Sequence, residues 1–201
     1  MNWSTMWQQL HLAPPPTLAD ELSAAYSQPH RYYHTLQHLQ ECLTLLAQLQ
    51  HLAEQPAHIA LALYFHDAIY DVYATDNEAQ SAAWAAKVLT EMGAESTLIS
   101  RIETMIMATQ HHAPLLQSDT DSQLLVDIDL AILGRESARF NEYELQIRQE
   151  YHWVSAEQFR QGRGQVLRSF LDRPTIFSTD YFRENFEQQA RLNIQTTLTR
   201  L

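Results

Sequence analysis

An adjacent histidine and aspartate, His66 and Asp67, lie within an apolar run that extends from Ala62 to Tyr70. An imidazole and a carboxylate are costly to bury unless they are hydrogen-bonded, paired with a charge or bound to a metal ion. Partners for the doublet are therefore expected elsewhere in the chain. Two pairs of residues with suitable side chains flank it, namely His34 and His38 upstream and Asp127 and Asp129 downstream.

A histidine, the His-Asp doublet and a later aspartate would together supply two imidazole nitrogens and two carboxylate oxygens. Such a mixed donor set suits a divalent transition metal. The doublet alone is a weak signal, because 10 histidines in 201 residues give roughly half of one such pair by chance. Adjacent residues on a helix diverge by about 100°, so the two side chains would have to approach one ion from different sides. The residues leave open which upstream histidine and which downstream aspartate take part.

Helices are predicted as the elements that hold these residues. The chain has only 4 glycines, and its apolar residues recur at helical spacing. Thr35 is expected to cap a helix that carries His38, and Pro56 to open an enclosed helix whose apolar residues continue to Ile69. Further helices are expected at about 3–10, 17–26, 76–92, 95–112, 124–133, 137–153, 155–171 and 180–201. Gly93 is expected to end the third of these. The fold class is therefore all-α, and residues 1–201 are expected to form a single domain.

The charge balance limits the class of partner. The formal net charge is -11, which argues against a nucleic-acid polymer or an anionic membrane, since both attract cationic surfaces. A single cysteine, Cys42, rules out a disulfide within the chain and is expected to be a small buried residue on a helix. The N-terminus lacks the pattern of a signal peptide, and no apolar run reaches 18 residues, so a cytoplasmic location is expected. The oligomeric state stays open, with a homodimer among the alternatives.

The sequence resembles the HD superfamily of metal-dependent phosphohydrolases, and in particular a bacterial branch of predicted HD-domain hydrolases. The signature of the superfamily is a histidine, a later His-Asp doublet and a distant aspartate on an all-α bundle. Four segments carry the resemblance, which extends over most of the chain: Arg31 to His38, Phe65 to Asp71, Asp76 to Ala82, and Asp127 to Gly134. The resemblance implies one HD-type helical bundle with flanking N- and C-terminal helices.

The resemblance also implies a role for each residue of the site. The run from Tyr33 to His38 is similar to the Tyr-His-Asn-x-x-His run of cyclic-nucleotide phosphodiesterases, with Thr35 in place of the asparagine. It implies that His38 binds the metal and that His34 protonates the leaving group. Asp129 fits the aspartate of the family better than Asp127 does. The implied metal ligands are His38, His66, Asp67 and Asp129, and the implied catalytic residues are His34 and Asp67.

A second metal or a phosphate group would need further residues. Many two-metal members of the superfamily carry more histidines after the doublet, whereas this chain has Asp71, Glu78, His111 and His112 in the corresponding region. The last two are equally compatible with a surface position at a helix end. Phosphate recognition needs local positive charge, for which three arginines are candidates: Arg31, Arg135 and Arg163. The alternative for each of them is a surface ion pair.

The function implied by the resemblance is a metal-dependent phosphohydrolase, either a phosphomonoesterase or a phosphodiesterase. Its substrate would be a small phosphorylated metabolite or a nucleotide, attacked by a water that a divalent ion activates. The ion would be Mn, Fe, Ni, Zn, Co or Mg. Two alternatives remain, a non-hydrolytic HD protein that senses a metal or nucleotide, and a di-iron oxygenase of the same superfamily.

Overall fold

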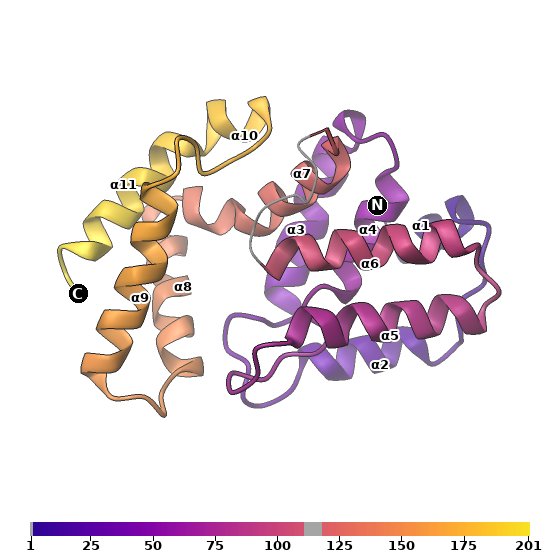
Figure 1. The fold of residues 1–201 in the computed structure, drawn as a ribbon, viewed down its shortest axis with the longest axis horizontal. Coiled ribbons are helices and arrows are strands. Elements are labelled where there is room, and N and C mark those ends of the chain that lie inside the picture. Colours follow the sequence, from indigo (N-terminus) through magenta and orange to yellow (C-terminus); the bar gives the residue numbers. More distant parts are fainter. Residues whose placement is uncertain (1, 111–117) are drawn as a thin grey trace. The chain divides into compact units, whose positions relative to one another are not determined.

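A computed structural model describes residues 2–110 and 118–201 of the chain (Figure 1). Within these residues the regular elements are eleven α-helices and two short 3₁₀ helices, and no strand occurs. The prediction of an all-α fold is therefore confirmed. The described residues form two compact units, one that extends as far as Ile128 and another from Asp129 to Leu201. The expectation of a single HD-type domain over residues 1–201 stays a prediction.

The first unit is arranged around α4 (Pro56–Phe65), a helix with apolar residues on all sides. Ile59, Leu61, Leu63 and Phe65 are each fully buried, as expected for a helix that other helices enclose. The other helices of this unit are α1 (Trp3–Gln9), α2 (Leu18–Tyr26), α3 (Leu36–Leu49), η1 (Gln50–Leu52), α5 (Asn77–Glu91), α6 (Ser96–Gln110) and α7 (Thr120–Asp129). Among them, α1, α3, α5 and α6 pack against α4.

The two ends of α4 are held in different ways. At its start, the Asp121 carboxylate accepts hydrogen bonds from the backbone N–H groups of Glu54 and Gln55, at 2.8 and 2.9 Å. At its other end, the helix stops at Phe65, four residues before the apolar run ends. His66 and Asp67 therefore lie at the end of the helix and in the turn that follows it. The polar groups of the doublet are placed where backbone carbonyls also need partners.

Two of the expected helix ends are confirmed. The Thr35 hydroxyl accepts a hydrogen bond from the backbone N–H of Gln37, so α3 begins with the cap that the sequence indicates. Gly93 follows α5 with a φ of 73°, a left-handed conformation that favours glycine. These ends fix the start of the helix that carries His38 and the close of the helix that covers α4.

The second unit consists of η2 (Leu130–Gly134), α8 (Ser137–Glu150), α9 (Ala156–Leu171), α10 (Asp180–Asn185) and α11 (Glu187–Leu198). The expected single helix from 180 to 201 is interrupted at Phe186, between α10 and α11. The Phe186 ring joins the buried rings of Phe177 and Phe182, and its backbone lies against Gly134. Burial of this aromatic cluster explains why the helix breaks at that residue.

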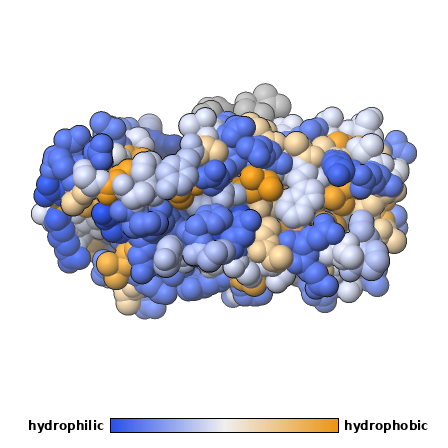
Figure 2. All heavy atoms as spheres, turned by 90° about the horizontal axis from the view of Figure 1, so that it is seen from below, coloured by the Kyte–Doolittle hydropathy of each residue, from blue (hydrophilic) through white to orange (hydrophobic). Residues whose placement is uncertain are grey.

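Hydrophilic residues predominate on the face that Figure 2 shows. In the view of Figure 2, hydrophobic residues are scattered among hydrophilic ones and do not form one continuous patch. Over the described residues, no helix combines the length and the apolar character that a membrane span requires.

Candidate metal centre

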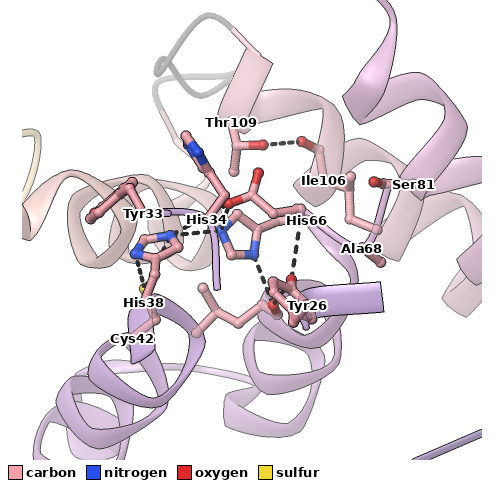
Figure 3. A network of polar contacts seen from close by, with 12 residues as sticks. Tyr26, Tyr33, His34, His38, Cys42, His66, Ala68, Ser81, Ile106 and Thr109 are labelled. Atoms are coloured by element: carbon pink, nitrogen blue, oxygen red, sulfur yellow. Dashed lines mark hydrogen bonds and ion pairs between the residues drawn. The ribbon is translucent and has the colours of Figure 1, made fainter. Parts of the chain in front are cut away.

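Two buried histidines from different helices meet in the first unit. His38 lies in the first turn of α3, and His66 follows the last residue of α4. Their side chains point toward one another, as Figure 3 shows, and their Nε2 atoms are 3.1 Å apart. His38 is 2% exposed and His66 is 1% exposed. The sequence prediction that these two residues share one site is consistent with this geometry.

The hydrogen bond on the other side of the His66 ring fixes which nitrogen carries a proton. Nδ1 of His66 lies 2.8 Å from the backbone carbonyl oxygen of Leu63, which can only accept, so Nδ1 is the donor. In a neutral imidazole, Nε2 then presents a lone pair. This lone pair faces Nε2 of His38 and a carboxylate oxygen of Asp67. Because neighbouring lone pairs repel one another, either a cation or a proton on one of the two Nε2 atoms must lie between them.

The Asp67 carboxylate adjoins both rings. Its Oδ2 atom lies 3.0 Å from Nε2 of His66 and 3.5 Å from Nε2 of His38. Burial raises the pKa of Asp67, but the charges of His66 and His34, a hydrogen bond with His66 and the charge of His38 together lower it well below its usual value. The carboxyl group is therefore ionised at neutral pH, which is the form that binds a metal ion.

Asp129 completes a group that could hold a metal ion. One atom from each of His38, His66 and Asp129 lies within 4.8 Å of the other two. Asp129 is the last residue of α7, so the helix that supplies Ile128 and Asp121 to the first unit also places its backbone. Asp127 is fully buried two residues earlier, which is about 200° away around the helix. The geometry thus favours Asp129 among the two downstream aspartates.

The distances fit a mixed nitrogen and oxygen donor set. Ligand atoms about 2.1 Å from one ion, and about 90–110° apart at it, are separated by roughly 3.0–3.4 Å. The separations among Nε2 of His38, Nε2 of His66 and Oδ2 of Asp67 run from 3.0 to 3.5 Å, and the Asp129 ligand atom lies within 4.8 Å of both histidines. Metal-binding histidines also commonly donate their second N–H to a backbone carbonyl, as His66 does. The residues present therefore suit a divalent metal ion.

His34, the residue expected to donate a proton, is half-buried beside this group. Its ring stacks on the ring of Tyr70, with centroids 4.1 Å apart, and meets the His38 ring edge-on at 6.2 Å. The charge of His34 also contributes to the low pKa of Asp67. His34 therefore lies beside the group that could hold a metal ion, and its expected role stays a prediction.

Arg31 lies in the same region but is 5% exposed. Its guanidinium donates hydrogen bonds to the backbone carbonyls of His34, Asp67 and Ala68, at 3.1, 2.6 and 3.0 Å. These bonds show that the Arg31 guanidinium serves backbone carbonyls. They do not test the prediction that it contacts a phosphate.

The remaining candidates for a second metal or a phosphate contact are dispersed. Glu78 lies in the first turn of α5. In the second unit, Arg163 is paired with Glu144, and Arg135 lies over the ring of Phe186. His111 and His112 lie outside the described residues. For all of them a functional role stays a prediction.

Sequence reasoning missed two residues that support the site. The Tyr26 hydroxyl accepts a hydrogen bond from the backbone N–H of Asp67 at 3.3 Å and lies 3.5 Å from the Leu63 carbonyl oxygen. The thiol of Cys42, expected only as a small buried residue, lies 3.7 Å from Nδ1 of His38. Cys42 stands one helical turn after His38, a spacing that could have indicated the contact. No local signal connects Tyr26 with a residue 41 positions later.

Comparisons of this chain with protein-family models, with curated proteins and with solved structures yield no match. The resemblance to the HD superfamily therefore stays a prediction that depends on the sequence motifs.

Proposed function

We propose that this protein is a metal-dependent phosphohydrolase that acts on a small phosphorylated metabolite or a nucleotide. The observation that carries the proposal is that His38, His66 and Asp129 form a group that could hold a metal ion, with the Asp67 carboxylate beside both histidine rings. These residues come from three separate parts of the chain. The sequence motifs that resemble the HD superfamily add the reaction class.

The four residues would hold one divalent ion, with Mn, Fe, Ni, Zn, Co and Mg as candidates. When bound, such an ion acidifies a water molecule and stabilises negative charge on a phosphoryl oxygen. Asp67 is suited to this role because its low pKa keeps its carboxylate ionised. Burial of both histidines limits the competing water around the site.

His34 would supply the proton that the leaving oxygen needs when the phosphorus–oxygen bond breaks. The imidazolium form of a histidine can act as a general acid. Its half-buried position leaves part of the ring accessible, whereas His38 and His66 are enclosed. The stack with Tyr70 would hold the ring in one orientation during the transfer.

The acidic chain favours a small substrate over a nucleic-acid polymer, because its net charge of -11 repels a polyanion. Phosphomonoesters and phosphodiesters both remain within the proposal. We also expect the protein to act in the cytoplasm.

The test is metal analysis of the purified protein, followed by a panel of phosphomonoesters and phosphodiesters with Mn²⁺, Mg²⁺, Ni²⁺ and Zn²⁺. His66→Ala and Asp67→Ala should each abolish turnover. His152→Ala is a matched control, because the His152 ring makes the same bond to a carbonyl three residues earlier at the end of α8, yet is exposed. This control should retain full activity.

Other outcomes would contradict the proposal. Saturable nucleotide binding with no product would indicate a sensor, and oxygen consumption with two irons per chain would indicate a di-iron oxygenase. Hydrolysis that persists in both His66→Ala and Asp67→Ala would place the activity elsewhere.

A further inference from the structure

Arg31 connects two segments that both belong to the candidate metal centre. One segment is the loop before α3, which contains His34, and the other is the turn after α4, which contains Asp67. The guanidinium reaches the backbone carbonyls of His34, Asp67 and Ala68 from a position that is 95% shielded from solvent, since Arg31 is 5% exposed. Its Nε donates to the side chain of Gln28 at 3.2 Å.

We propose that Arg31 is a positioning residue that holds the proton-donor loop and the His-Asp turn in the geometry that binds the metal. This inference rests on the proposed function, because it assigns Arg31 a part in the same site.

The carbonyls explain why an arginine is needed. Backbone carbonyl groups at the C-terminal end of a helix lack hydrogen-bond donors within that helix. The helix dipole also favours a cation near this end. Asp67 and Ala68 follow the end of α4, and Arg31 supplies donors to both carbonyls. Only a planar guanidinium offers several N–H groups in a fixed fork, whereas a lysine ammonium is a single point charge.

Two aromatic rings extend the effect of Arg31 to His34. The guanidinium carbon lies 5.3 Å from the centroid of the Tyr26 ring and 5.4 Å from that of Tyr70. Tyr70 in turn stacks on His34, and the Tyr26 hydroxyl accepts from the Asp67 backbone. Loss of the guanidinium would therefore loosen the metal-binding turn and the orientation of His34 together.

The test measures binding of Co²⁺ to the metal-free protein, by calorimetry and by the visible absorption of the bound ion. The variants are Arg31→Gln and Arg31→Lys. Arg148→Gln is the matched control, because Arg148 also donates to two backbone carbonyls, of Tyr151 and Val154, and lies 4.9 Å from the Phe159 ring centroid. It belongs to the second unit.

We expect both Arg31 variants to bind Co²⁺ about 10- to 100-fold more weakly than the unchanged protein, with an altered absorption spectrum. Arg148→Gln should keep the original affinity and spectrum, even if its thermal stability falls. If Arg31→Gln does not fold, Arg31→Lys decides the question, because it retains the positive charge.

Two results would overturn the inference. One is unchanged Co²⁺ affinity in a folded Arg31 variant. The other is a raised KM for a phosphorylated substrate with unchanged metal affinity, which would instead support a phosphate contact by Arg31. Failure of the unchanged protein to bind Co²⁺ would refute the metal centre itself, so this outcome is distinct from failure of the inference.

Discussion

The cap that Asp121 provides for α4 should make a large contribution to the stability of the first unit. Asp121 is 3% exposed, and its two carboxylate oxygens accept from the backbone N–H groups of Glu54 and Gln55 at 2.8 and 2.9 Å. Asp121→Ala leaves both donors without this acceptor and removes a negative charge from the positive end of the helix dipole.

The magnitude follows from the two hydrogen bonds. A hydrogen bond to a charged group contributes about 1.5–3 kcal/mol. The lower end applies here, because Glu54 and Gln55 are exposed and water can partly replace the carboxylate. Because two such bonds are lost, Asp121→Ala should lower the free energy of unfolding by at least about 3 kcal/mol, with the lost dipole interaction adding to this. Asp121→Asn retains one acceptor oxygen and should lower it by about 1.5 kcal/mol.

Urea denaturation followed by tryptophan fluorescence measures this change, because Trp3, Trp7 and Trp84 all lie in the first unit. Asp20→Ala is the control, since Asp20 is an exposed acid in the first turn of α2. Its effect should stay within about 0.5 kcal/mol. A loss below about 1 kcal/mol in Asp121→Ala would refute the reasoning, because one hydrogen bond to a charged group alone is worth more.

The ion pair of Arg101 and Asp119 should make stability depend on pH in acid. The hydrogen bond from Arg101 lowers the pKa of Asp119 to about 2, so its stabilisation is complete above about pH 4 and is lost as the pH falls through 2. After solvent screening, the ion pair contributes about 1 kcal/mol to the free energy of unfolding. Urea midpoints measured at several pH values should therefore depend less on pH in Arg101→Met than in the unchanged protein. Equal pH dependence in the two proteins would contradict this prediction. Gly134→Ala should cost about 2 kcal/mol, because the added Cβ would lie 2.7 Å from the Cβ and carbonyl oxygen of Phe186. Gly162→Ala should instead stabilise α9 by about 0.5–1 kcal/mol, since its Cβ would meet nothing within 4 Å; thermal unfolding of the two variants with the same sign of change would refute this contrast.

Local sequence patterns predicted the helices and helix ends, because these depend on residues that are close together in the chain. Helical spacing of apolar side chains identified the helices, and the nearly uninterrupted apolar run after Pro56 identified α4 as the enclosed one. Thr35 and Gly93 marked helix ends because their side-chain and backbone preferences act within one turn. The helix that leads to His66 was expected to continue to Ile69, but it ends at Phe65. The spacing of apolar residues does not show where a helix ends and a turn begins.

Partners distant in the chain were harder to predict. Asp121 caps a helix that begins 65 residues earlier, and Tyr26 binds the backbone of Asp67 from 41 residues away. Arg31 was a candidate for phosphate contact because of its charge, and that role stays a prediction. Its hydrogen bonds to three backbone carbonyls and to the Gln28 side chain were not foreseen. No local pattern encodes such contacts, because they depend on how helices pack.

The sequence by itself determined the all-α class and the presence of a His-Asp doublet in an apolar run, with candidate partners upstream and downstream. Both follow from residue type and spacing, which act over a few residues. Only the tertiary structure brought His38 to 3.1 Å from His66 and favoured Asp129 over Asp127. Two aspartates two positions apart on a helix point in nearly opposite directions, so the orientation of α7 decides which one faces the histidines.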